Sequence, residues 1–468
     1  MAKTKISVRK FSLPILSVFL IYVLLGALLP PLRHSNADSV IIGSTSENRT
    51  VSERVLCLDN NDDALFWRLR LIEEAKEDIV LSTFDLRDDE SGQDIIAALL
   101  NAAERGVHVR LLIDSLYGKL YLSNSRGFAA LLSHPNVEAY FYNPVNLLTP
   151  WTANYRMHDK YLIADDFAYI LGGRNTCDLF LGNSAEQQNV DRDVLVYSNT
   201  SEADSSLSML RYYFESVWAL KCNRPISYSM DEKTLSAGKA ALRERFEEMD
   251  ERIQGLSEAF SWEEQTMEAA SVTLLSNPVE AKNKAPTLWN ELCLYMADGH
   301  DIAIQTPYFI CSREMYDEFS KLCSDDSRSL TVYTNAVETG ANVFGRMDYL
   351  LSKKAIQNTG VTLCEYMGNR SMHTKTLLID DNLSIIGSFN MDMRSAYLDT
   401  ELMLAIDCPS LNAQLREQLG QMAAKSRLVS PDGAVEYGVD YMPVSLSTGK
   451  RIIYYVLGLV LRPIRHLL

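Results

Sequence analysis

The sequence predicts an α/β protein of two tandem, similar halves, each a mixed sheet flanked by helices, with one active site at the interface between the halves. Two observations predict this fold class. Helix-like and strand-like periods alternate along the 468 residues, and the same spaced set of polar residues occurs once in each half. An apolar run close to the N-terminus adds a predicted transmembrane helix to this fold.

The first half shows the alternation most clearly. Residues 63–76 are rich in helix-forming types and lead into the strand-like run 79–81. A second helical period covers 91–105 and is followed by Gly106, a residue type that commonly ends helices, before a strand predicted at 107–114. This order of helices and strands is typical of an α/β layer architecture.

The second half repeats the order of the first. The segment 301–309 matches 78–84 in pattern, and 330–333 occupies the place of the strand at 107–114. Residues 231–270 are highly charged and favour helix, so we expect a helical linker whose acidic side chains face solvent. The predicted organisation is an N-terminal membrane anchor and tether at 1–37, a first half at 38–228, a helical linker at 229–285, a second half at 286–445, and a basic, apolar, membrane-associated tail at 446–468.

Two identically spaced sets of residues carry the predicted chemistry. In both sets Lys, Asp, Gly and Asn follow a His by two, seven, fourteen and seventeen positions. One such match would be ambiguous, because a His beside a Lys is commonly a surface feature. Two matches at equivalent points of a repeat, in a chain with seven histidines, favour a functional site. The sets are His158, Lys160, Asp165, Gly172 and Asn175, and His373, Lys375, Asp380, Gly387 and Asn390.

Each set is predicted to form a hairpin that presents its polar groups to one point. A histidine and a lysine two positions apart share one face of a strand. A two-residue turn at 166–167 places His158 opposite Asn175, and a turn at 381–382 does the same for the second set. An imidazole, an ammonium and a carboxamide that converge in this way form a receptor for a phosphate with a nucleophile beside it.

These motifs resemble those of the phospholipase D superfamily, and the resemblance covers residues 54–445. Flanking segments are similar to the bacterial cardiolipin synthase branch of that superfamily. The chain departs from this branch at Asp399, where Asn is usual, and in its single N-terminal apolar run, where many members carry two spans. The segments with the closer resemblance are 156–158, 172–175, 305–309 and 390–395.

The resemblance implies catalysis through a covalent phosphohistidine. One histidine attacks phosphorus, the other protonates the leaving alkoxide, and an alcohol or water completes the reaction. The family favours His158 as nucleophile and His373 as general acid, although the symmetry of the motifs leaves the reverse open. It implies no cofactor and no metal, and the eight cysteines include no Cys-x2-Cys pair of the kind that binds zinc. The residues expected to bind the non-bridging oxygens are Lys160, Lys375, Asn175 and Asn390.

Four acidic residues have predicted supporting roles. Asp165 and Asp380, the last members of the two motifs, are expected to fix the hairpins rather than to touch substrate. Asp193 and Glu401 match the family positions that hold the tautomer of each histidine. The alternative for both is an ordinary acid at a strand edge.

The charge of the chain weighs against nucleic acid as a partner. The formal net charge is −16 and the sequence pI is about 5.0, whereas nucleic-acid binders commonly present a basic surface. We therefore expect membrane phospholipids as substrates, phosphatidylglycerol and a second phospholipid, with cardiolipin as the product. Hydrolysis to phosphatidic acid is the alternative, and a nuclease or a catalytically silent membrane-binding module are less favoured hypotheses.

Both ends of the chain carry membrane-like segments. Basic residues before the apolar run 11–29 predict a single span in the cell membrane, with the catalytic part outside the cytoplasm. A signal peptide cleaved near 35–37 is the alternative, and it also exports the catalytic part. The apolar stretch 452–461 is too short to span, so we expect its basic flanks to hold it in the membrane interface, or the stretch to pack on the core.

Overall fold

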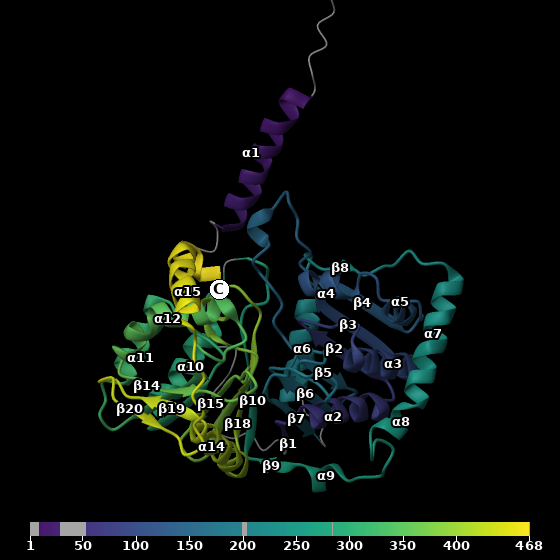
Figure 1. The fold of residues 1–468 in the computed structure, drawn as a ribbon. Helices are drawn as coiled ribbons and strands as arrows, with labels where there is room; N and C mark the ends of the chain where they lie inside the picture. Colours follow the sequence, from purple (N-terminus) through teal and green to yellow (C-terminus); the bar gives the residue numbers. More distant parts are fainter. Residues whose placement is uncertain (1–8, 29–52, 199–203, 283, 468) are drawn as a thin grey trace, which may run out of the picture.

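Two mixed sheets form the framework of the molecule (Figure 1). The computed structural model describes residues 9–28, 53–198, 204–282 and 284–467. Within these ranges each of the two large sheets has nine strands, and a small two-stranded sheet accompanies them. The tether and the alternative cleavage site near 35–37, together with the basic residues at 1–8, lie outside the described residues.

The strands divide between the two halves in chain order. The first sheet contains β1 (Glu53–Leu58), β2 (Asp78–Thr83), β3 (His108–Asp114), β4 (Val137–Tyr142), β5 (Tyr161–Ala164), β6 (Ala168–Gly172), β7 (Asp193–Ser198), β8 (Arg224–Pro225) and β9 (Met267–Ala269). The second contains β10 (Ser271–Ser276), β11 (Asp301–Gln305), β13 (Ser329–Asn335), β14 (Thr362–Tyr366), β15 (Thr376–Ile379), β16 (Leu383–Gly387), β18 (Leu402–Asp407), β19 (Ser426–Val429) and β20 (Val435–Tyr437). The small sheet pairs β12 (Phe309–Ile310) with β17 (Met391–Asp392).

The helices follow the same division. The described helices are α1 (Arg9–Leu28), α2 (Asn61–Glu74), α3 (Glu90–Glu104), α4 (Ser115–Leu122), α5 (Arg126–Leu132), α6 (Ser206–Trp218), α7 (Glu232–Glu247), α8 (Met249–Arg252), α9 (Trp262–Gln265), α10 (Thr287–Asp298), α11 (Arg313–Leu322), α12 (Val343–Gln357), α13 (Met393–Tyr397), α14 (Pro409–Ala424) and α15 (Thr448–Leu461). Two short 3₁₀ helices are η2 (Pro150–Thr152) and η3 (Arg462–Leu467).

The two large sheets share one strand order, which confirms the predicted duplication. In the first, β2, β3 and β4 are parallel neighbours, and β5, β6, β7 and β1 continue the sheet antiparallel on the other side of β2. The second repeats this arrangement with β11, β13 and β14, and with β15, β16, β18 and β10. The parallel strands need crossover connections, and helices supply them.

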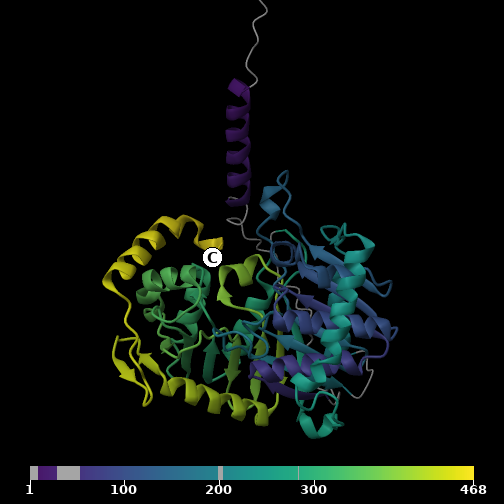
Figure 2. The ribbon, with the colours of Figure 1, turned by 45° about the vertical axis from the view of Figure 1, so that its right-hand side comes forward.

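The sheets face each other across a shared apolar core. This core includes Val80 and Leu171 from the first sheet and Ile386 and Leu404 from the second, and α6 and α14 complete it. Helices α2, α3 and α5 cover the outer face of the first sheet, and α10, α11 and α12 cover that of the second. The result is a layered α/β body whose halves lie side by side in Figures 1 and 2.

The predicted helices at 63–76 and 91–105 are confirmed as α2 and α3. The Asn60 side chain caps α2 by accepting a backbone hydrogen bond of 2.9 Å, and Asp89 caps α3 in the same way at 3.2 Å. Gly106 has a φ of +100°, a left-handed conformation that glycine adopts without steric cost, and it follows the end of α3. The strands predicted after these helices are confirmed as β2 and β3.

The linker is helical only in part. The acidic side chains of α7, α8 and α9 are largely exposed, as predicted. Residues 267–269 and 271–276, however, form β9 and β10, so the prediction of a helical linker up to 285 is wrong there. Val272 and Leu274 alternate inward from β10, a pattern that suits a half-buried strand. The chain therefore passes from the edge of one sheet to the edge of the other.

Each motif hairpin turns through three residues rather than the predicted two. β5 and β6 pair Ala164 with Ala168 around the loop. This register differs by one residue from the one that would place His158 directly opposite Asn175, so that prediction is wrong. The second hairpin has the same three-residue loop and the same shift.

Left-handed aspartates explain the longer loops. Asp165 and Asp380 have φ angles of +42° and +48°, which Asp tolerates better than most residues. The Asp165 carboxylate accepts hydrogen bonds of 2.8–2.9 Å from the backbone N–H groups of residues 76–78, just before and at the start of β2. The Asp380 carboxylate likewise accepts hydrogen bonds of 2.9 Å from the backbone N–H groups of residues 300 and 301, just before and at the start of β11. Both aspartates thus fix their hairpins, in agreement with the prediction.

The N-terminal apolar run forms α1, which stands off the body in Figures 1 and 2. Among the helices of the described residues, none combines the length and the apolar character that a membrane span requires. The predicted transmembrane helix is therefore not supported.

The C-terminal tail packs on the second half. The guanidinium of Arg346 in α12 lies 5.0 Å from the ring centre of Tyr454 in α15. Gly458 lies so close to Leu351 that a Cβ at this position would come within 2.7 Å of it. Of the two predicted arrangements, packing on the core describes this face of α15, while its other face is exposed.

The hairpin role of Asp165 can be tested by Asp165→Asn. This change removes a carboxylate from three backbone donors, and we expect the free energy of unfolding to fall by about 1–2 kcal/mol. The neighbouring Asp166→Asn is the control, because Asp166 is exposed and forms a surface ion pair with Arg211, and its effect should stay within about 0.5 kcal/mol. Urea unfolding measures both. Unchanged stability with lost turnover in Asp165→Asn would contradict the structural role.

Candidate active site

The two motifs meet in one cavity between the halves. The cavity has a volume of 290 Å³, and its lining includes His158 and Asn175 from the first half and His373 from the second. Aromatic rings also line it, with Phe84 4.9 Å from the His158 ring and Phe180 4.9 Å from the His373 ring. The single site predicted at the interface is therefore present.

A carboxylate from the second half holds His158. Its Nδ1 lies 2.9 Å from Oε1 of Glu401, as predicted for that residue. Glu401 is completely buried and accepts hydrogen bonds from the hydroxyl groups of Ser388 and Ser395. Because Nδ1 is engaged in this way, Nε2 is the ring nitrogen that is available to a substrate.

A carboxylate from the first half holds His373, and it belongs to Asp191. The Nδ1 atom of His373 lies 2.6 Å from Oδ2 of Asp191, and the ammonium of Lys375 lies 3.8 Å from the same oxygen. Burial alone would raise the pKa of Asp191, but the charges of Lys375 and His373 outweigh it and hold the pKa at about 2. Asp191 is therefore firmly ionised.

Asp193 does not contact His373, so its predicted role is wrong. Its carboxylate pairs instead with Arg68 at 2.8 Å and with Arg174 at 3.5 Å. Asp191 and Asp193 are two positions apart and share one face of an extended chain. Alternation alone therefore could not distinguish them.

Two short bridges between the halves position the carboxylates. Val190 pairs with Met372, and Thr400 pairs with Met157. Asp191 follows Val190 in the chain, and His373 follows its bridge partner Met372. In the same way Glu401 follows Thr400, and His158 follows Met157. Each of the two motif histidines thus lies beside a carboxylate of the opposite half, and neither half alone supplies both members of a histidine–carboxylate pair.

The motif lysines are buried beside the histidines. Nζ of Lys160 donates a hydrogen bond of 2.5 Å to the backbone oxygen of His158, and Lys375 donates to that of His373. Burial is the main cause that lowers the pKa of Lys160 to about 7 and that of Lys375 to about 8. An anion in the cavity would favour the charged form of both lysines.

The motif asparagines add unsatisfied amide groups. Asn175 and Asn390 are buried, and among the described residues no side chain or backbone group pairs with their Oδ1 atoms. The amide Nδ2 groups of these asparagines and the two lysine ammonium groups are donors, the kind of group that binds the non-bridging oxygens of a phosphodiester. Within the described part of the chain, no group of three or more His, Cys, Asp or Glu side chains is arranged to hold a metal ion.

The chain is similar to known proteins in sequence and in fold. The family model described as "Cardiolipin synthase, PLD-like domain" matches residues 69–218 and 293–423, one segment in each half. The chain belongs to this family. Cardiolipin synthase C of Escherichia coli (strain K12) is 27% identical over 402 residues, which cover 76% of this chain and 82% of the relative. An uncharacterized protein of Helicobacter pylori (strain J99) is 27% identical over 442 residues, which cover 85% of each chain.

A solved structure supports the fold of this PLD-like family member. The crystal structure of phosphatidylserine synthase from Haemophilus influenzae Rd KW20 superposes with a TM-score of 0.61. The match covers 89% of this chain and 96% of that one at 15% sequence identity. At this identity the likeness concerns the fold alone, and it supports two PLD-like halves.

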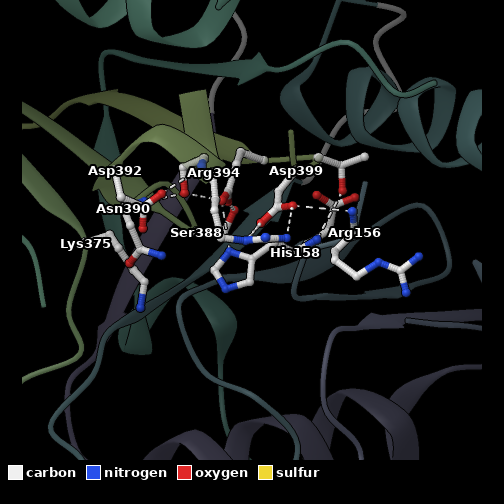
Figure 3. A network of polar contacts seen from close by, with 12 residues as sticks. Arg156, His158, Lys375, Ser388, Asn390, Asp392, Arg394 and Asp399 are labelled. Atoms are coloured by element: carbon white, nitrogen blue, oxygen red, sulfur yellow. Dashed lines mark hydrogen bonds and ion pairs between the residues drawn. The ribbon is translucent and has the colours of Figure 1, made fainter. Parts of the chain in front are cut away.

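Ion pairs beside His158 form a network that the motifs did not predict. Asp399 accepts hydrogen bonds from Arg394 at 2.9 Å and from the backbone N–H of Arg156 at 3.3 Å (Figure 3). Arg156 lies 3.4 Å from Asp114. Asp399 thus pairs with a cation and joins the second half to the segment that leads to His158. The sequence signal for it was the departure of Asp399 from the resemblance to cardiolipin synthases.

Lys284, at the end of the linker, is a second residue that the sequence did not single out. Its side chain is buried, and no hydrogen-bond partner for Nζ exists among the described residues. Burial lowers the pKa of Lys284 to about 8, and the charges of Asp399 and Asp159 oppose this shift. The buried ammonium therefore offsets part of the negative charge behind His158.

The two imidazoles differ in how readily they hold a proton. Burial and then Lys160 lower the pKa of His158 well below its usual value. Burial and then Lys375 lower the pKa of His373 to about 4, but the ionised Asp191 opposes this shift directly. A bound phosphate anion would add to the opposition. Both imidazoles are therefore shifted toward the neutral form, and at His373 an ionised carboxylate in direct contact opposes the shift.

The assignment of Asp191 can be tested with two matched variants. We expect Asp191→Asn to lower kcat by about 10³-fold, because an amide neither holds the tautomer of His373 nor stabilises its charged form. Asp193→Asn should keep kcat within about threefold and lower the melting temperature, since it weakens a buried ion-pair cluster. Steady-state turnover of a phosphodiester and thermal unfolding measure the two effects. A large kcat loss in Asp193→Asn alone would reverse the assignment.

Proposed function

We propose that the chain is a phospholipid phosphatidyltransferase of the phospholipase D type, and specifically a cardiolipin synthase. It would transfer a phosphatidyl group from phosphatidylglycerol or a second phospholipid to the glycerol hydroxyl of an acceptor phosphatidylglycerol, with the donor's alcohol as the leaving group. The observation that carries the proposal is the pair of buried histidines that line one cavity, each held by a carboxylate of the opposite half and each contacted by a buried lysine. The family match and a relative named cardiolipin synthase C support it.

The first step transfers the phosphatidyl group to the enzyme. Nε2 of His158 attacks phosphorus, the bond from phosphorus to the leaving alkoxide breaks, and protonated His373 gives its proton to that alkoxide. Asp191 favours the protonated form of His373 before the step. The motif lysines and asparagines hold the non-bridging oxygens while charge develops on them.

The second step releases the product. Neutral His373 takes the proton from the hydroxyl of an acceptor lipid, the hydroxyl oxygen attacks phosphorus, and the bond to His158 breaks. Water in place of the lipid alcohol would yield phosphatidic acid instead. Both reactions use the same residues, so the acceptor decides between transferase and hydrolase.

Lipid product analysis tests the proposed reaction. Full-length protein is added to phosphatidylglycerol vesicles with and without phosphatidylethanolamine, and the lipids are separated and identified. We expect cardiolipin, and its formation should fall by at least about 10³-fold in His158→Ala and His373→Ala, since each removes a reacting group. Phosphatidic acid without cardiolipin would make the protein a hydrolase. No change of lipid in any sample would reject both activities.

The roles of the two histidines can be separated with a phosphatidyl ester of p-nitrophenol. This leaving group departs at neutral pH without a proton, so His373→Asn should still complete the first step and then stop. We expect a burst of one equivalent of nitrophenolate and a phosphatidyl group bound to His158. His158→Asn should give no burst. The opposite pattern would exchange the roles of the two residues.

A further inference from the structure

Equivalent helices of the two halves bring apolar side chains to the mouth of the cavity. α4 follows β3, and α12 follows the equivalent strand β13. Tyr117 of α4 and Asn342, the N-cap of α12, both line the cavity. Nearby, Leu120 is 67% exposed and Phe344 is 51% exposed. We define the apolar rim as Leu116, Leu120, Tyr121, Val343 and Phe344.

The loop before the first motif and the C-terminal helix extend this apolar surface. In the loop, Leu148 is 72% exposed and Trp151 is 41% exposed. The Tyr22 hydroxyl of α1 donates a hydrogen bond of 2.7 Å to the backbone oxygen of Leu148, so α1 meets the body here. Figures 1 and 2 show α1, this loop and α15 on the same side of the molecule. The exposed apolar residues of α15 include Ile452, Ile453, Tyr455, Val456, Leu459 and Val460.

The charge of this surface is opposite to that of the whole chain. The chain has 61 Asp and Glu residues, yet the segments that build the surface contain none. These segments are 115–122, 143–154, 339–346 and 448–467. Their basic residues are Lys119, Arg346, Lys450, Arg451, Arg462 and Arg465, of which Arg465 is already paired with Asp348 of α12. A face that is both apolar and basic in an acidic chain indicates a binding surface.

We propose that this face docks on an anionic phospholipid bilayer, with the apolar rim in the lipid and the cavity open toward it. A lipid then moves from the bilayer into the cavity without its acyl chains crossing water. This inference rests on the proposed function, because it assumes a lipid substrate.

The chemistry of the face favours a bilayer over a second copy of the chain. Pairing about a two-fold axis brings the same surface of two copies together, so its basic residues would meet one another and no acidic residue of the same segments would balance them. Anionic headgroups supply that balance. Trp and Tyr side chains at the edge of an apolar surface are also typical of a membrane–water interface, and Trp151, Tyr121 and Tyr455 lie there.

The kinetic test combines Leu120→Glu and Phe344→Glu in the full-length protein. Neither side chain lines the cavity, and both are exposed enough for the fold to tolerate the change. We expect the rate on phosphatidylglycerol vesicles to fall at least tenfold, because two carboxylates at the rim oppose insertion and anionic headgroups. The rate on monomeric dihexanoyl phosphatidylglycerol should stay within about twofold. Equal losses on vesicles and monomers would overturn the docking proposal.

A control variant introduces one exposed carboxylate at the other end of the sheet. Tyr212 in α6 is 77% exposed and is next to Arg211, which pairs with Asp78 at the start of β2. The cavity lies beyond the opposite end of β2, where Phe84 lines it. Tyr212→Glu should therefore leave the rates on vesicles and on monomers unchanged. A vesicle-specific loss in this control would also contradict the proposed surface.

A second measurement does not depend on turnover. In a His158→Ala background, fluorescence quenching of Trp151 is recorded with vesicles of bromine-labelled phosphatidylglycerol or phosphatidylcholine, and a Trp151→Phe variant identifies its share of the signal. We expect quenching with phosphatidylglycerol that the double Glu variant reduces at least threefold. If the His158→Ala protein shows quenching and the protein with an intact site turns over no phospholipid, the proposed function is rejected and the docking surface is kept. No quenching, or a dimer that the Glu changes dissociate, would overturn the docking surface.

Discussion

The exchange of carboxylates between the halves is the interaction on which the active site depends. Each imidazole contacts an acid that the opposite half supplies, at 2.9 Å for His158 and at 2.6 Å for His373. A small change in the packing of the sheets would therefore disturb both pairs at once. Arg192 helps to fix that packing, since it reaches from the first half to Gln305 and Thr376 of the second. Duplication of a half thus yields one site rather than two.

Burial gives the site its reactivity and also its cost. Two ammonium groups and two amides are held away from water, and burial lowers the pKa of both lysines. Removal of these groups from water is unfavourable, so part of the folding free energy is used to hold them there. A phosphodiester relieves this cost on binding, most of all as charge develops on its oxygens. The lysines and asparagines therefore stabilise the charge that develops in the transition state more strongly than water in the cavity would.

Local sequence patterns predicted the parts of the structure that depend on local chemistry. Capped, periodic segments gave the correct helices α2 and α3, and the spacing from histidine to asparagine identified the residues that meet in the cavity. The predictions failed where distant pairing decides the outcome. Asp191 and Asp193 are equivalent by alternation, and only the bridge from Val190 to Met372 distinguishes them. The strand at 267–269 forms because the edge of a sheet is present beside it, which a charged, helix-like segment does not reveal.

The symmetry of the fold also explains why one face carries both the chemistry and the apolar rim. Parallel strands end together, so loops and helices that follow them gather at one edge of each sheet. Here the two sheets place those edges on the same side, and the segments after β3 and β13 become neighbours of one cavity. The apolar residues that α4 and α12 add at this edge are therefore related by the same duplication as the two histidines. The tail and α1 also meet on this side, since Nε2 of His466 lies 3.3 Å from the backbone oxygen of Leu28. In the proposed docking, one face of the duplicated fold therefore serves both substrate entry and catalysis.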